Sequence, residues 1–116
     1  NIIIGYDADA STTSTDNEIT LGNSSITKFR IPGCGGFNID TNGHVLPGSN
    51  NASDLGSTSY RWANLYTNDL NLSNEGSVNK VDGTWGNYTI QEGESDLFLI
   101  NNRSGKKYKF NLTEVS

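Results

Sequence analysis

Five residues near the C-terminal end of the chain have the chemistry of a sugar-binding site. Trp85 and Tyr88 lie among glycine, asparagine and threonine, and such small neighbours leave aromatic rings open. An open ring offers its apolar face to the C–H groups of a sugar. Asn101, Asn102 and Arg103 lie in an adjacent predicted turn and offer hydrogen bonds and charge. These five residues are the candidate receptor-binding site, although Trp85 also fits a second interpretation as a buried core side chain.

The sequence contains no residue pattern that indicates catalysis. Glu92 and Glu94 flank a glycine in what reads as a connection between strands. This position favours two solvated carboxylates over an acid–base pair. No Ser-His-Asp order, no Cys-His pair and no glycine-rich loop opening a helix is recognisable. We therefore predict that the chain is not an enzyme.

No metal or cofactor site is expected either. Asp7, Asp9 and Ser11 have the spacing that begins a calcium loop, but the later glycine and the closing glutamate are missing. His44 is the only histidine, so a metal on it would need copies from symmetry-related chains. Cys34 is the only cysteine, so the chain forms no internal disulfide. Its thiol is either buried and inert or faces its copies on a symmetry axis.

The residues of the candidate site lie on three predicted strands, 84–91, 96–101 and 107–113. The last strand alternates, with Tyr108 and Phe110 on one side and lysines on the other. A period of two indicates a half-buried strand. The sequence therefore predicts a three-stranded meander whose apolar side needs a cover, because a sheet of this size cannot be stable alone.

Turn residues divide the remainder of the chain. Gly105 supplies the positive φ that the last hairpin needs, and Asn42-Gly43 between apolar pairs predicts another hairpin. Ser57 is placed to cap one helical turn over residues 60–62. The run 65–72 suggests a strand with a break near residue 68.

Two strand-and-glycine units open the chain. Ile2–Ile4 precedes Gly5, and Ile19–Leu21 precedes Gly22. Such units are typical of β-solenoid coils, which are stable only when stacked. Ile26–Ile31 is a further strand candidate. Because Asn1 opens directly on a strand, we expect the chain to be the C-terminal part of a longer protein.

These elements predict three segments. Residues 1–33 form a solenoid-like or head-like shaft segment, 34–75 a hairpin and connector with a short helical turn, and 76–116 a compact β-meander tip. The fold class is all-β, because no window shows apolar residues at helical spacing.

Composition limits both the core and the partners. Leu, Ile, Val and Phe make up 26 of the 116 residues, close to the lower limit for a chain that folds. We therefore expect other copies of the chain to supply the missing core. The net charge of −5 argues against nucleic acid as a partner. No apolar stretch is long enough for membrane insertion.

Several motifs resemble those of bacteriophage tail fibre proteins. Ile4–Ala8 followed by Asn17–Asn23 is similar to the head repeats of trimeric adhesins and of many tail fibres. Asp54–Ser57, with residues 60–62 and 65–66, resembles a segment near the C-terminus of tail fibres. The run from Val81 to Tyr108 resembles the ending of tail fibres from marine phages, including cyanophages.

The resemblance implies an elongated, intertwined homotrimer on the distal tail fibre of a virion, outside the cell. It implies attachment to the bacterial host surface, through a glycan or an outer-membrane receptor. The alternative is a purely structural trimerisation or shaft module whose receptor site lies elsewhere. Tail fibre segments of this kind often precede an autocleaving chaperone with a Ser-Lys dyad, but no equivalent is present, so we expect no self-cleavage. The predicted trimer core consists of Trp62, Leu65, Phe98, Tyr108 and Phe110.

Overall fold

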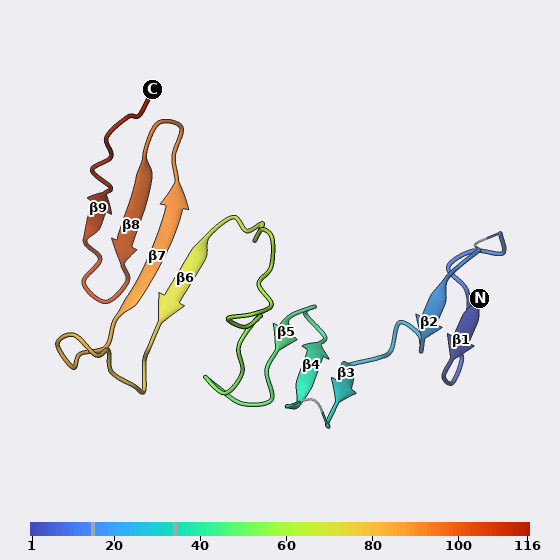
Figure 1. Cartoon of the computed structure of the whole chain (residues 1–116). Helices are drawn as coiled ribbons and strands as arrows, with labels where there is room; N and C mark the ends of the chain where they lie inside the picture. Colours follow the sequence, from blue (N-terminus) through green and yellow to red (C-terminus); the bar gives the residue numbers. More distant parts are fainter. Residues whose placement is uncertain (15, 34) are drawn as a thin grey trace. The chain divides into compact units, whose positions relative to one another are not determined.

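The structure is a computed structural model, and it describes residues 1–14, 16–33 and 35–116. The predictions for Cys34 lie outside the described residues. Across these ranges the regular structure is entirely β, with nine strands and no helix (Figure 1). The chain divides into two compact units, Asn1–Arg61 and Trp62–Ser116.

The first unit begins with a parallel pair of strands, β1 (Ile2–Ile4) and β2 (Ile19–Leu21). Each strand is followed by a glycine, and the amide of Gly22 donates a 2.7 Å hydrogen bond to the carbonyl of Ile4. Gly5 has a φ of +136°, and a Cβ there would lie 2.9 Å from the Cα of Gly22. The two predicted strand-and-glycine units therefore lie side by side in register, and glycine is required where their backbones meet.

Three antiparallel strands complete the regular structure of the first unit: β3 (Lys28–Ile31), β4 (Phe37–Asp40) and β5 (Val45–Leu46). The predicted Asn42-Gly43 hairpin is confirmed, with Gly43 at a φ of +79° and its amide 3.0 Å from the carbonyl of Asp40. The strand β3 pairs with β4 along its whole length, from Lys28 opposite Asp40 to Ile31 opposite Phe37.

The predicted helical turn after Ser57 is wrong. The amide of Ser57 donates to the carbonyl of Tyr60 at 2.9 Å, whereas a helix would run its bonds from later amides to earlier carbonyls. The amide of Tyr60 donates in return to the Ser57 hydroxyl at 3.1 Å. Ser57, Thr58 and Ser59 favour such local bonds over a helix, which explains the open turn.

The second unit is a four-stranded antiparallel sheet in the order β6-β7-β8-β9. The sequence predicted a strand near each of these four positions. The strand candidate in the run 65–72 was placed in the connector, and β6 from this run pairs with β7 within the compact unit Trp62–Ser116. The strands are β6 (Leu70–Ser73), β7 (Asn87–Glu92), β8 (Leu97–Asn101) and β9 (Lys107–Lys109).

Tight connections join β7, β8 and β9. The amide of Gly93 donates to the carbonyl of Asp96 at 2.8 Å, which closes a two-residue turn. Glu92 and Glu94 are exposed there, as expected of solvated carboxylates. At the next connection Gly105 has a φ of +75° and donates to the carbonyl of Asn101 at 2.8 Å. The predicted role of Gly105 is therefore confirmed.

Residues opposite each other on neighbouring strands project from the same face of a sheet. Leu70 opposes Ile90, Ile90 opposes Leu99, and Leu99 opposes Tyr108. The face defined by this row is here called the apolar face; the other is called the polar face. The apolar face carries Leu70, Leu72, Tyr88, Ile90, Leu97, Leu99, Tyr108 and, just beyond β9, Phe110.

Nothing in the described part of the chain buries a hydrophobic side chain. On the apolar face Leu70 is 38% exposed and Tyr108 47% exposed, so part of this face is open to solvent in the single chain. The most enclosed side chain of the second unit is Thr89, on the polar face of β7. Each unit therefore holds its shape mainly by backbone pairing and side-chain hydrogen bonds.

Candidate functional site

The five predicted receptor-binding residues lie together at one end of the four-stranded sheet. Trp85 precedes β7 and Tyr88 lies on it, while Asn101 ends β8 and Asn102 and Arg103 follow in the β8–β9 loop. Because Tyr88 pairs with Asn101, the start of β7 and the end of β8 meet. This end, formed by the 74–86 and 102–106 loops, is here called the loop end.

Trp85 and Arg103 form a stacked pair. The guanidinium carbon of Arg103 lies 3.7 Å from the centre of the indole ring. Its Nη1 also donates a 2.9 Å hydrogen bond to the carbonyl of Trp85. Trp85 is half-buried and Arg103 is exposed. One face of the indole is therefore covered by a cation, where the sequence suggested an open ring.

Asn101 holds the β8–β9 loop in shape. Its side-chain oxygen accepts the backbone amides of Arg103 at 3.0 Å and of Ser104 at 3.2 Å. Its amide nitrogen donates to the Tyr88 hydroxyl at 3.2 Å. The side chain thus positions Arg103 on the loop and links the loop to β7.

Asn102 joins a hydrogen-bonded ladder across the polar face. Its Nδ2 donates to the side-chain oxygens of Asn87 and Thr89, each at 2.9 Å. The Thr89 hydroxyl then donates to Oδ1 of Asn71 at 2.7 Å. The ladder connects the loop end to β6 through Thr89, which is only 7% exposed. Asn101 and Asn102 therefore shape the site, while Arg103 and Trp85 form its accessible part.

The 74–86 loop supports Trp85, a role that was not predicted from the sequence. Its Asn79 Oδ1 accepts the amides of Val81 at 2.8 Å and Asp82 at 3.0 Å. Asp82 Oδ1 accepts the Thr84 hydroxyl at 2.7 Å and Nδ2 of Asn79 at 2.7 Å. These bonds, led by the one from Thr84, hold the pKa of Asp82 below its usual value. The turn chemistry of Asn, Asp and Gly in this run was the available signal.

Asn74 ties the same loop to the start of β7. Its side-chain oxygen accepts a hydrogen bond from the backbone amide of Gly86 at 2.7 Å, and the backbone amide of Asn74 donates to the carbonyl of Gly86 at 3.3 Å. The ring of Tyr88 lies against Gly86, where a Cβ would approach the ring to 2.9 Å. Trp85 is thereby fixed between two bonded neighbours.

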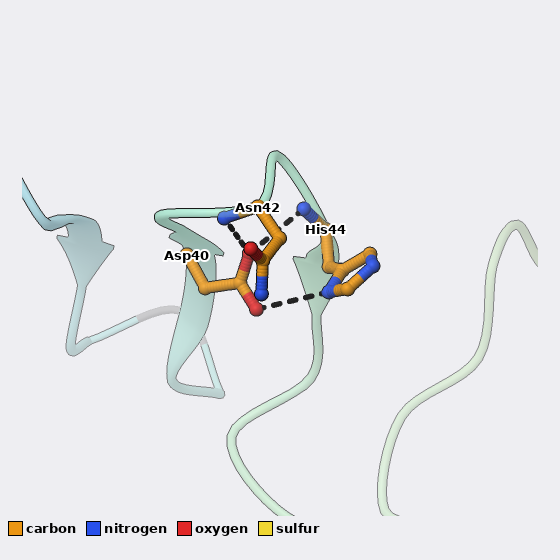
Figure 2. Close-up of polar contacts among 3 residues, drawn as sticks. All are labelled: Asp40, Asn42 and His44. Atoms are coloured by element: carbon orange, nitrogen blue, oxygen red, sulfur yellow. Dashed lines mark hydrogen bonds and ion pairs between the residues drawn. The ribbon is translucent and has the colours of Figure 1, made fainter.

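His44 has a local structural role in the β4–β5 hairpin. Its Nδ1 lies 3.0 Å from Oδ2 of Asp40, and Oδ1 of Asp40 accepts the backbone amides of Asn42 and His44 at 2.9 and 3.0 Å (Figure 2). These contacts, led by the His44 amide, hold the pKa of Asp40 below its usual value. The arrangement is that of an Asp-anchored turn.

Two of the residues with calcium-loop spacing near the N-terminus, Asp9 and Ser11, form local hydrogen bonds. Asp9 Oδ1 accepts the amide of Ala10 at 2.8 Å, and the Ser11 hydroxyl donates to the Glu18 carboxylate at 2.8 Å. Bonds from Thr20 and Ser11 hold the pKa of Glu18 below its usual value. Among the described residues, no three His, Cys, Asp or Glu side chains are grouped so that they could hold a metal ion.

The predicted trimer-core residues do not share one surface. Trp62 and Leu65 are 68% and 66% exposed in the single chain. Phe98 opposes Lys109 and therefore lies on the polar face, whereas Tyr108 lies on the apolar face. The Phe98 ring instead lies against Gly93, within 2.6 Å of where a Cβ would be. Burial of these residues between chains stays a prediction.

Comparisons with protein-family models, with curated proteins and with solved structures found no match. A search of the described residues for a helix long and apolar enough to cross a membrane found none.

Proposed function

We propose that this chain is the C-terminal region of a bacteriophage tail fibre, which assembles as an elongated, intertwined homotrimer and attaches to the bacterial host surface. In this proposal the protein lies outside the cell, at the distal end of the fibre, and the loop end of the four-stranded sheet contacts a surface glycan or outer-membrane receptor. The assignment to tail fibre proteins rests on the sequence motifs that resemble theirs.

The uncovered apolar face is the observation that carries the assembly proposal. Eight large apolar or aromatic side chains share it, and none of them is fully buried within the single chain. Apolar burial contributes about 25 cal/mol per Å², so one chain forgoes most of the stabilisation that a domain of this length normally gains. In the proposed trimer, the apolar faces of three chains would pack against one another around the symmetry axis and form one shared core.

The parallel pairing of β1 and β2 supports a solenoid-like shaft. Ile2 opposes Ile19 and Ile4 opposes Leu21, so one strand-and-glycine unit lies directly against the next. Ile2, Ile4 and Leu21 are 54%, 61% and 49% exposed in the single chain. An intertwined trimer would bury such side chains between its coils.

The loop end supports the receptor-binding proposal. It presents an aromatic ring, a guanidinium and several amides, held in place by the Asn101 and Asn102 bonds. A preorganised site loses less conformational entropy on binding than a flexible loop does.

The alternative is a purely structural trimerisation module. It is favoured by the internal engagement of Asn101 and Asn102, whose bonds serve the loop itself. In this alternative, the Trp85–Arg103 stack closes one end of the sheet and the receptor site lies on another part of the protein.

Attachment of the purified chain to bacteria tests the proposal. Sedimentation over a range of concentrations should give the mass of three chains, and labelled protein should bind saturably to cells of a susceptible strain. Excess unlabelled protein or intact phage should compete. A stable, folded monomer refutes the assembly proposal, and a trimer that binds none of a broad panel of strains supports the structural alternative.

Trp85→Ala separates the two roles of the loop end. The receptor-binding proposal expects weaker attachment to cells while the trimer melts near its original temperature. Loss of the trimer, with attachment lost as a consequence, would place Trp85 in the core. Tyr66→Ala is a matched aromatic control, because Tyr66 is 91% exposed and lies outside the sheet.

A further inference from the structure

We propose that the Arg103–Trp85 stack binds an anionic group, a carboxylate or a phosphate, carried by a sugar of a surface polysaccharide. This inference rests on the proposed function and narrows its ligand from glycans in general to acidic glycans. Its basis is that the loop end presents a guanidinium lying on an aromatic ring, in place of the bare ring that neutral sugars favour.

The geometry fixes the guanidinium and leaves most of its donors free. Arg103 stacks on the indole at 3.7 Å and uses one nitrogen to bond the Trp85 carbonyl at 2.9 Å. A guanidinium has five N–H donors. The guanidinium of Arg103 has no other hydrogen-bond partner among residues 1–14, 16–33 and 35–116. The remaining donors form the planar fork that binds carboxylate or phosphate through paired hydrogen bonds.

The loop that carries Arg103 is held before any ligand arrives. Asn101 accepts the amide of Arg103 at 3.0 Å, and the amide of Asn102 donates to the carbonyl of Asn87 at 2.8 Å. A guanidinium that is already stacked and bonded loses little rotamer freedom when an anion binds. The site therefore resembles a preorganised anion receptor more than a mobile surface arginine.

Charge is segregated along the strands of the sheet. Four of the eight basic residues of the chain lie between residues 103 and 109, and no acidic residue lies between 97 and 113. The loop end carries four basic residues, Lys80, Arg103, Lys106 and Lys107, and two acidic ones, Glu75 and Asp82, so it is net positive. The acidic residues at the opposite end are Asp69, Glu92, Glu94 and Asp96. The field of this arrangement favours an anion at the loop end and disfavours one at the other end.

The same charge pattern favours a sugar over a long polyanion such as a nucleic acid. Residues 62–116 contain five Lys or Arg and seven Asp or Glu, so the unit is net negative at −2. Lys109, nearest the acidic end, already pairs with Asp96 at 3.7 Å. Nucleic acids need a basic surface that follows many phosphates. A single anionic group on an otherwise neutral sugar fits the small basic patch at the loop end.

Binding to defined polymers tests the inference. The purified full-length chain is titrated with polygalacturonate, with a phosphorylated mannan and with neutral dextran at low ionic strength. We expect binding to one or both acidic polymers and none to dextran, and the preferred polymer identifies carboxylate or phosphate as the recognised group. Arg103→Gln should weaken the binding by about tenfold or more, since a charged hydrogen-bonding partner is lost.

Two further variants control for charge and for folding. Lys109→Gln removes the same charge from the same unit and should change affinity by less than about twofold, as expected for an exposed paired lysine. Arg103→Lys keeps the charge but loses the planar fork, and should bind more weakly than the wild type while melting at the same temperature. If Arg103→Gln fails to fold, Arg103→Lys still tests whether the planar guanidinium binds the anion.

Three outcomes of the binding titrations overturn the inference. They are no binding to either acidic polymer, equal loss for Arg103→Gln and Lys109→Gln, and equally tight binding of a single-stranded oligonucleotide. Attachment to bacteria is measured with the same variants. If the wild type attaches and Arg103→Gln attaches equally well, the inference fails and the proposed function stands. If the wild type attaches to no cells, the proposed function fails even where the acidic polymers bind.

Discussion

Phe98 and Tyr108 project from opposite faces of the same sheet, because Phe98 opposes Lys109 and Tyr108 opposes Leu99. A flat association through one face cannot bury both rings. The apolar face, which carries Tyr108, is the better candidate for the interface between copies. The ring of Phe98 lies against Gly93 of its own hairpin.

This relationship gives a prediction about assembly. Leu99→Ala, on the apolar face, should weaken association by about 2–5 kcal/mol if the side chain is fully buried in the assembly. Phe98→Ala, its neighbour on the polar face, should leave the assembly intact and lower only the melting temperature. Sedimentation across a concentration series measures both effects. If Phe98→Ala dissociates the assembly as strongly as Leu99→Ala, the polar face is part of the interface.

The hydroxyl of Thr89 should contribute to stability more than an ordinary threonine hydroxyl does. Thr89→Val keeps the shape but leaves Oδ1 of Asn71 and Nδ2 of Asn102 without their 2.7 and 2.9 Å partner. The expected loss in the free energy of unfolding is about 1–3 kcal/mol. Chemical denaturation measures it. Thr113→Val, at an exposed residue beyond β9, is the control and should change stability by less than about 0.5 kcal/mol. An equal loss of stability in Thr89→Val and Thr113→Val would contradict a stabilising role for the hydrogen-bonded ladder.

Acid should destabilise the 74–86 loop through Asp82. Its pKa is lowered in the folded chain by hydrogen bonds from Thr84 and Asn79. A lowered folded-state pKa gives stability that is present above the usual value of 3.8 and is lost as the pH falls through the folded value. The melting temperature between pH 7 and pH 2 should therefore fall less for Asp82→Asn than for the wild type. Glu94→Gln, in the exposed β7–β8 turn, is the matched control and should follow the wild-type profile.

Glycine at position 5 is required by space as well as by backbone conformation. Gly5→Ala would place a Cβ 2.9 Å from the Cα of Gly22 at a φ of +136°. Gly43→Ala has a φ of +79° but open space around its Cβ, so it carries the conformational strain alone, about 1–2 kcal/mol. Amide hydrogen exchange should show faster opening of β1 and β2 in Gly5→Ala than of β4 and β5 in Gly43→Ala. Equal protection of both strand pairs would mean that β1 and β2 do not lie in contact at these glycines.

Local patterns in the sequence predicted most of the strands and two of the turns of this chain. The alternation in β9, the glycine at 105 and the Asn42-Gly43 pair are local signals, and each was confirmed because a turn conformation depends on a few neighbouring residues. The grouping of the candidate site was also predictable in part. Once β7 and β8 form a hairpin, Tyr88 and Asn101 must meet.

The tertiary structure decided what depends on pairing between distant residues. The assignment of β6 to the C-terminal sheet follows from its register with β7, which no local pattern in residues 65–72 encodes. The opposite faces of Phe98 and Tyr108 and the stacking of Arg103 on Trp85 likewise follow from strand register and loop geometry. A shift of one residue in register exchanges the two faces of a strand, so sequence alternation alone predicts that a face exists but not which partners share it.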